Sequence, residues 1–384
     1  MPSEGSLAAS GSPSKSSRAC RLRVLREPLF RFDRTMAPAA RSADELIRVL
    51  DESCTATLAS LKRPTREPAA LSSAESSSPP SLSDIRNDVI AHLQAISKEV
   101  TAISLALRPP VSQDALKGTL EKLVGVVGKL VYAAELLPRD GTLAKRMNWT
   151  VQESLEAFQH FLSSISSTLA APSSSAKSAR DELLRSAKTV WSVVDKAQGL
   201  PKDELEAERL GWKDVLGLLD DCLEEMKEMG EAEDAGAEED EDEEEEEDDD
   251  DFGSTPLTPA QRERITAAHL LLRLTRLLVN RLFTKTAPPS PSPAFTDPSF
   301  LASAHTLVSR VSEMGDDLAA ALEPPQDELK EAVEEVLSVG EELAKCIEGA
   351  VDERGSEEVK KAEMEWLGVW RKQRDTAKAK LDAI

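Results

Sequence analysis

The chain has 384 residues, of which 40% are hydrophobic and 4% aromatic, and its formal charge is −23. Residues 231–251 hold 17 acidic and no basic residues, so the rest of the chain sums to −23 + 17 = −6, an ordinary surface charge. No run of 18 or more apolar residues occurs, which excludes a transmembrane helix. The scattered cysteines and histidines argue against a disulfide framework and against a structural zinc site, and no metal or cofactor is predicted. These residues are Cys20, Cys54, Cys222, Cys346, His92, His160, His269 and His305.

The first 41 residues are rich in Ser, Pro, Ala and Arg, with seven basic and two acidic residues from Lys15 to Arg34. We interpret residues 1–41 as a disordered basic tail. Two alternatives stay open. An Arg- and Ser-rich segment that is poor in acidic residues is also typical of a mitochondrial transit peptide, and translation could begin at Met36.

From residue 42 onward, apolar residues recur every three or four positions, which is the period of an amphipathic helix. The clearest stripe runs from Ile85 to Leu107, and Val100 in its middle is predicted to be fully buried. Prolines or a glycine follow each pattern and predict its end. The first five patterns span Leu46–Leu61, Ile85–Leu107, Leu116–Leu137, Leu143–Leu169 and Leu183–Val194.

Five more helical patterns follow in the second half of the chain. Thr258 before Pro259, with Gln261 at the third helical position, predicts a capping box at the start of one of them. Asp297 before Pro298 predicts the start of another. These five patterns span Leu205–Met229, Ile265–Leu282, Leu301–Leu322, Leu329–Ile347 and Val359–Leu381.

Ten helical patterns without β alternation predict an all-α protein. Long amphipathic helices on short connections pack as antiparallel bundles, and the absence of a fixed repeat length disfavours a solenoid. We predict two bundles of about five helices each, over residues 42–199 and 200–384. The second bundle would contain a disordered acidic insert at 231–257.

Residues 238–251 are fourteen consecutive acidic residues. Such a run repels itself and is predicted to be disordered. It is interpreted either as a solvated linker or as an arm that attracts basic proteins, such as a histone or a ribosomal protein. Direct DNA binding is disfavoured because DNA phosphates would be repelled. The arm residues taken as candidate contacts are Glu238, Glu239, Asp240, Glu247 and Asp251.

A second candidate binding site lies on the last predicted helix, where Trp366 and Trp370 are four residues apart beside Arg371, Lys372 and Arg374. The two tryptophans are either anchors for a partner or core residues that close the second bundle. The sequence contains no phosphate-binding glycine loop and no nucleophile elbow. No catalytic residue is therefore predicted.

Four segments carry a family resemblance: ISKEVTAISLAL at 96–107, VYAAELLPRDGTLAKRM at 131–147, VWSVVDKAQGLPKDE at 190–204 and DCLEEMKEM at 221–229. They resemble the cyclin-D-binding protein family, also called GCIP-like, over roughly residues 43–235. Each motif is a structural turn or helix end. The matching positions include Tyr132, Leu136, Leu137, Pro138, Asp140, Gly141, Leu143 and Trp191.

The resemblance implies an all-helical, non-enzymatic protein of the cytoplasm and nucleus. It implies binding to cyclins of the D type or to adaptor and helix–loop–helix partners, and negative regulation of cell-cycle progression. The Pro/Ser linkers are typical of a GC-rich fungal genome, which suggests a fungal member. Two alternatives remain: an acidic chaperone or adaptor for basic proteins, and a vinculin-like cytoskeletal bundle.

Overall fold

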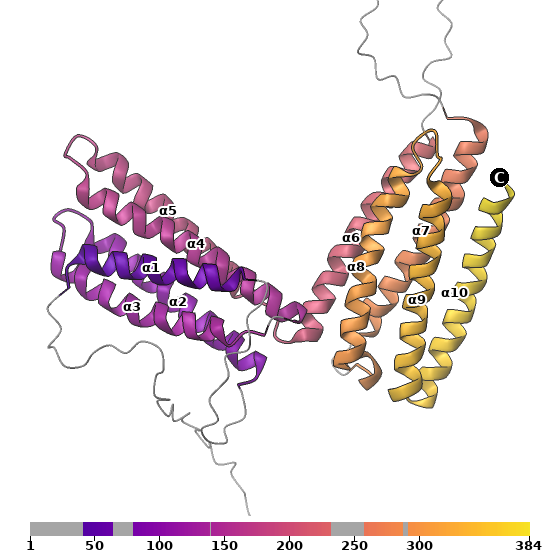
Figure 1. Cartoon of the computed structure of the whole chain (residues 1–384), viewed down its shortest axis with the longest axis horizontal. Helices are drawn as coiled ribbons and strands as arrows, with labels where there is room; N and C mark the ends of the chain where they lie inside the picture. The colour runs from indigo at the N-terminus through magenta and orange to yellow at the C-terminus, as the bar shows by residue number, and fades with distance from the viewer. Residues whose placement is uncertain (1–40, 64–79, 139, 232–256, 287–290) are drawn as a thin grey trace, which may run out of the picture. The chain divides into compact units, whose positions relative to one another are not determined.

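The computed structural model describes residues 41–63, 80–138, 140–231, 257–286 and 291–384. Within these ranges all regular secondary structure is helical, which confirms the predicted fold class. The predicted basic tail up to residue 40 and the acidic arm lie outside the described residues. Figure 1 shows the helices in chain order, coloured from indigo to yellow.

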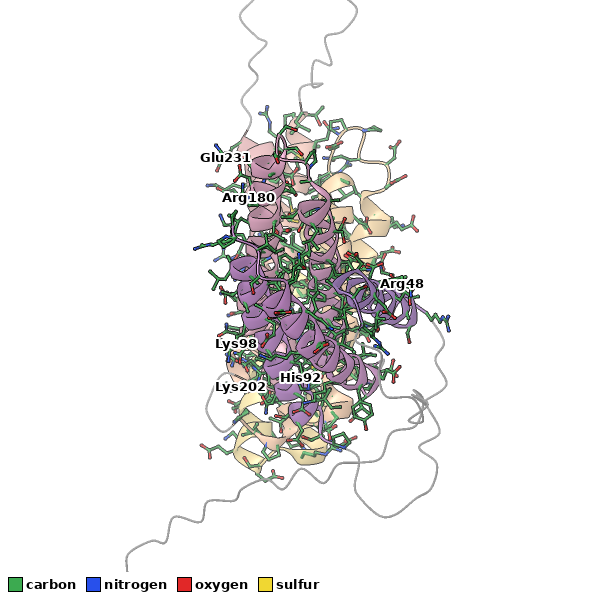
Figure 2. The ribbon with its side chains drawn as sticks, turned by 90° about the vertical axis from the view of Figure 1, so that its left-hand side faces the viewer. Arg48, His92, Lys98, Arg180, Lys202 and Glu231 are labelled. Atoms are coloured by element: carbon green, nitrogen blue, oxygen red, sulfur yellow. The ribbon has the colours of Figure 1, made fainter. Side chains whose placement is uncertain are left out.

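The first five helices form one hydrophobic cluster, in which α1 packs on α3 and α4, α2 on α3 and α5, and α4 on α5. Val100 of α2 is 0% exposed in this cluster, as its stripe predicts. The polar faces carry charged side chains that project from the helices, as Arg48 and Arg180 do in Figure 2. The bounds are α1 Ala43–Leu61, α2 Leu82–Ala106, α3 Gln113–Glu135, α4 Thr142–Ala170 and α5 Ala176–Ala197.

The other five helices form a second cluster, in which α6 packs on α7 and α8, α9 on α8 and α10, and α10 on α7. A short 3-10 helix, η1 (Pro293–Phe295), precedes α8 and packs on α9. The bounds are α6 Glu204–Glu231, α7 Pro259–Lys285, α8 Pro298–Ala320, α9 Leu329–Arg354 and α10 Glu357–Ala383.

Two helix starts in the second cluster follow the predicted capping chemistry. The Thr258 hydroxyl accepts from the Gln261 backbone N–H, and the Gln261 side chain accepts from the Thr258 N–H, which completes the capping box of α7. The Asp297 carboxylate accepts from the N–H groups of Ser299 and Phe300 at the start of α8. Hydrogen bonds to Ser299 are the main reason that the pKa of Asp297 falls to about 2.

The connection between α5 and α6 belongs to the packing of the first cluster. Leu200 in this connection and Ala207 in the first turns of α6 both pack with α1–α5. The first core residue of the second cluster is Trp212, one turn further along α6. The predicted division near residues 199–201 thus lies beside a helix whose start contacts the first cluster.

Candidate functional site

The turn between α3 and α4 carries the main family-like motif, and its backbone conformation depends on glycine. Gly141 is the N-cap of α4 with φ +99° and ψ 145°, a region that side-chain-bearing residues almost never adopt. Glycine has no side chain to cap the helix. The carboxylate of Glu204, at the start of α6, accepts hydrogen bonds from the N–H groups of Thr142 and, at 3.2 Å, Leu143. The negative charge of Glu204 also interacts favourably with the positive end of the α4 dipole and so stabilises the start of this helix.

A second carboxylate of α6 extends this contact to α8. The hydroxyl of Thr142 donates to Glu208, whose side chain is only 2% exposed. The Nδ1 atom of His305 lies 3.1 Å from Glu208 and 3.2 Å from the Thr142 hydroxyl. A buried carboxylate is tolerated only when such partners replace its water. We call Gly141, Thr142, Glu204, Glu208 and His305 the junction, because they join α4 to α6 and α8.

The geometry of the junction indicates a structural role for these residues. In a nucleophilic triad, histidine bridges the hydroxyl and the carboxylate through its two different ring nitrogens. Here Thr142 and Glu208 contact the same nitrogen of His305, and the hydroxyl donates directly to the carboxylate. Neither Glu208 nor His305 is predicted from the sequence, because a contact between residues 97 positions apart leaves no local periodic signal.

We expect Gly141→Ala to lower the free energy of unfolding by about 1–3 kcal/mol, because alanine is strained at this φ and ψ. Its Cβ would also lie 3.2 and 3.3 Å from the two carboxylate oxygens of Glu204. The matched control is Gly125→Ala on α3, where a Cβ meets nothing within 4 Å. That change should stabilise the helix by about 0.5–1 kcal/mol. Urea unfolding followed by circular dichroism measures both, and an unaltered Gly141→Ala midpoint would contradict the proposed backbone strain.

The other residues of the family-like motifs differ widely in burial. Leu143 is 1% exposed in the first cluster, whereas Tyr132 is 54% exposed on α3. Leu136, Leu137 and Trp191 are half-buried, while Pro138 and Asp140 are exposed. Exposed Tyr132 and the 70% exposed Trp149 of α4 are therefore the large aromatic side chains that this region offers to a partner.

The two tryptophans of α10 occupy different environments. Trp370 is 3% exposed, and its indole N–H donates to the Leu274 carbonyl at 2.9 Å. This position is that of a core residue that closes the second bundle. Trp366 is half-buried, and the guanidinium of Arg281 lies 4.9 Å from its ring centroid. Contact of either tryptophan with a partner stays a prediction, and Trp366 is the more accessible of the two.

The basic residues beside these tryptophans form ion pairs with α9. Arg371 contacts Glu341 at 2.9 Å and also Glu348, and Arg374 contacts Glu341. Burial alone would raise the pKa of Glu341, but hydrogen bonds from the two arginines outweigh it and lower that pKa. Lys372 is exposed. Two of the three flanking cations are thus engaged within the protein.

The described thiols have pKa values far above neutrality. Burial raises the pKa of Cys54 to about 12 and that of Cys346 to about 11. Burial and a hydrogen bond to Asp316 raise the pKa of Cys222 to about 11. Thiols that stay protonated at neutral pH are poor nucleophiles and poor metal ligands. In the described part of the chain, no group of three or more His, Cys, Asp or Glu side chains is placed to hold a metal ion.

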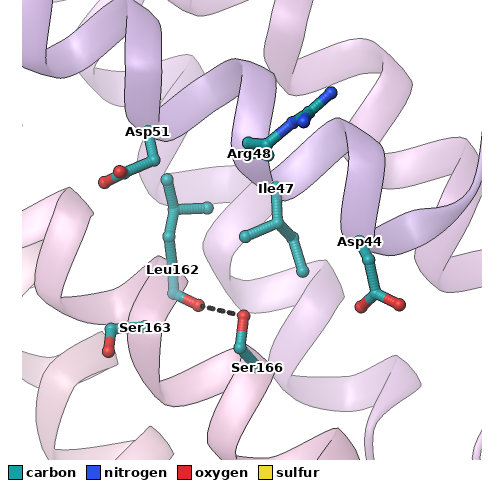
Figure 3. A pocket seen from close by; sticks show the side chains of 7 residues that line it. All are labelled: Asp44, Ile47, Arg48, Asp51, Leu162, Ser163 and Ser166. Carbon is teal, nitrogen blue, oxygen red and sulfur yellow. Dashed lines mark hydrogen bonds between the residues drawn. The ribbon is translucent and has the colours of Figure 1, made fainter.

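A surface groove of about 420 Å³ lies between α1 and α4. Ile47 and Leu162 form an apolar floor, and the carboxylates of Asp44 and Asp51 lie at its sides (Figure 3). Asp51 already accepts a hydrogen bond of 3.0 Å from Gln159 of α4. The groove is therefore a shallow depression on the first cluster, and one of its two carboxylates, that of Asp51, is already hydrogen-bonded within the protein.

The acidic candidate contacts Glu238, Glu239, Asp240, Glu247 and Asp251 lie outside the described residues. No described helix is long and apolar enough to cross a bilayer.

Comparison with known proteins identifies a similarity in the part of the chain that contains most of the junction. Residues 88–232 match the family model described as "Grap2 and cyclin-D-interacting, N-terminal". The match runs from α2 to the end of α6, so it includes Gly141, Thr142, Glu204 and Glu208 but not His305. A search of curated proteins gives no match to the chain. Over residues 88–232 the chain is thus similar to the N-terminal region of Grap2 and cyclin-D-interacting proteins, which confirms the predicted resemblance for that part.

Proposed function

We propose that this protein is a non-enzymatic regulatory protein that binds cyclin-like or helix–loop–helix proteins and restrains cell-cycle progression in the cytoplasm and nucleus. The observation that carries the proposal is the match of residues 88–232 to the cyclin-D-interacting family model. Two further observations support it. The described residues form helical clusters with exposed aromatic side chains, and their thiols and their buried junction are not arranged for catalysis.

The test is direct binding of the full chain to purified cyclins. The linkers resemble those of a fungal genome, so the G1 cyclins of the source organism are the appropriate probes, with a mitotic cyclin as the control. Biolayer interferometry should give binding to at least one G1 cyclin and weaker binding to the control. Trp149→Ser and Tyr132→Ser should each weaken the interaction if the matched region makes the contact. Equal, negligible binding to all cyclins and to helix–loop–helix domains would overturn the proposal.

A second candidate function, an adaptor for basic proteins, is favoured by the connection between α6 and α7. The two helices are antiparallel neighbours: Asp220 pairs with Arg276, and Arg209 stacks on Phe283. Antiparallel neighbours need only about 2–8 connecting residues, yet this connection runs from residue 232 to 258 and contains the acidic run. Its length therefore exceeds what the fold requires.

We expect the acidic run to control the rate of association with a basic partner more than the lifetime of the complex. A charged segment steers an oppositely charged partner over about 8–10 Å at physiological salt, and such fields act mainly on association. Replacing residues 238–251 with a Gly/Ser segment of equal length should slow association about tenfold at low salt. The salt dependence should flatten, with dissociation nearly unchanged.

Stopped-flow mixing with a purified Arg/Lys-rich protein such as a histone measures these rates. The control is the same replacement at residues 66–79, whose charged residues are Arg66, Glu67 and Glu75. A hundredfold faster dissociation of the 238–251 variant would identify the acidic run as the binding site itself, and the adaptor function would then replace the first proposal.

A further inference from the structure

The outer side of the second cluster carries a seam between α7 and α10 that is defined by two contacts. The indole N–H of Trp370 donates to the Leu274 carbonyl. About two turns further along α7 and two turns back along α10, the Nε and Nη2 atoms of Arg281 each donate to the Glu363 carboxylate at 2.9 Å. The helices are therefore antiparallel here. Side chains spaced three or four residues from these positions lie along the same seam.

Apolar side chains border this seam and remain accessible. Leu277 lies between the two contact positions of α7 and is 37% exposed. Trp366 lies between the two contact positions of α10 and is half-buried. Val369, three residues after Trp366, is 58% exposed. We define the α7/α10 face as Arg273, Leu277, Arg281, Trp366 and Val369.

The charge at this face is positive although the whole chain carries −23. Arg273, four residues before Leu277, is exposed and forms no ion pair with any described residue. The carboxylate of Glu363 is 0% exposed and is already contacted by two cations, Arg281 and Lys285. Burial lowers the pKa of His269, and the positive charge of nearby Arg273 lowers it further.

We propose that the α7/α10 face binds an acidic amphipathic segment of a partner protein. This proposal depends on the proposed function in one respect, that the chain binds other proteins. Leu277, Trp366 and Val369 supply the apolar contact area on which lasting affinity depends. Arg273 supplies a guanidinium that can bind a carboxylate through two hydrogen bonds. A basic segment would meet Arg273 and Arg281, while the carboxylate of Glu365, exposed next to Trp366, already lies 4.0 Å from Lys361. Amphipathic helices commonly bind by laying their apolar side along a groove between helices.

The probe is a fluorescein-labelled 18-residue helical peptide with leucines along one side and glutamates elsewhere. The control is a peptide of the same composition in scrambled order. Fluorescence anisotropy with the full chain at 0.15 M salt should give binding of the amphipathic peptide and at least tenfold weaker binding of the scrambled one. Arg273→Glu and Val369→Ser should each weaken binding tenfold or more, while Arg273→Lys should weaken it less, because lysine keeps the charge and loses only the paired hydrogen bonds. A photocrosslinking residue at position 369 should capture the amphipathic acidic peptide and not a version with lysine in place of glutamate.

The controls use comparably exposed residues of the first cluster. Leu105→Ser removes an apolar side chain of α2 that is 53% exposed, and Lys145→Glu reverses an exposed charge on α4. Both should leave peptide binding unchanged. Thermal unfolding of each variant establishes that it is folded, and Leu277→Ser provides a second apolar variant if Val369→Ser is unstable.

Three results would overturn the proposal: unchanged binding in Arg273→Glu, equal capture of the lysine peptide at position 369, or binding only after residues 238–251 are replaced. The last result would make the acidic run of this chain the occupant of the face. The outcome is separable from the proposed function. Cyclin binding that ignores Arg273→Glu and Val369→Ser refutes the face as its site, whereas peptide capture without cyclin binding refutes the cyclin partner.

Discussion

Val100→Asp is expected to destabilise the first cluster of helices by about 4–5 kcal/mol or more. Val100 is 0% exposed and lies in the middle of the apolar stripe of α2. Val100→Ala would cost only about 1–3 kcal/mol through lost apolar contacts and a small void. The carboxylate of an aspartate would be buried among apolar side chains without a hydrogen-bonding or charged partner. The cost should reach about 4–5 kcal/mol or more, the range of buried unpaired charges, which is a large part of a typical total stability of about 5–15 kcal/mol.

Circular dichroism and urea unfolding measure this effect. The matched control is Leu105→Asp, which makes a comparable change on the same helix at a position that is 53% exposed. It should retain nearly all of the wild-type stability. A Val100→Asp protein that unfolds at the wild-type midpoint would contradict the burial of this face of α2.

Glu363→Ala is expected to produce the second large effect, a loss of about 3–5 kcal/mol, because it leaves two cations beside an emptied site. The Glu363 carboxylate is 0% exposed and contacts Arg281 at 2.9 Å and Lys285 at 2.6 Å. These contacts fasten α10 to α7. Arg281 and Lys285 are 23% and 33% exposed and can turn toward water, so the loss should lie at the lower end of that range.

Thermal and urea unfolding should separate this change from Glu365→Ala on the same helix. Glu365 is 70% exposed and its nearest cation, Lys361, lies at 4.0 Å. Such an exposed pair contributes less than about 1 kcal/mol. The double variant Glu363→Leu with Arg281→Met should be more stable than Glu363→Ala, because it leaves one unpaired cation, Lys285, where Glu363→Ala leaves two. Equal stability of Glu363→Ala and Glu365→Ala would contradict a fastening role for the buried carboxylate.

The helices of this protein are predictable from sequence because their causes are local. Apolar residues three or four apart share a helix face whatever surrounds them. Val100 was therefore predictable as a core residue, and the structure gives it no exposure. Thr258 and Gln261 are equally local, since a capping box joins residues three positions apart, and both of its hydrogen bonds are present. The turn at Gly141 was recognisable by its resemblance to known proteins, although its φ of +99° was not.

Tertiary structure decided which of these positions meet. Trp366 and Trp370 are equivalent by helical spacing, yet only Trp370 is in the core. The orientation of α10 places Trp370 against Leu274, whereas Trp366 lies at the edge of the helix contact, beneath the guanidinium of Arg281. The junction is a stronger case. Thr142, Glu208 and His305 come from three helices, and their side chains meet only because α4, α6 and α8 pack at that point. Periodicity specifies the face of one helix, whereas a contact between distant residues depends on how several such faces fit together.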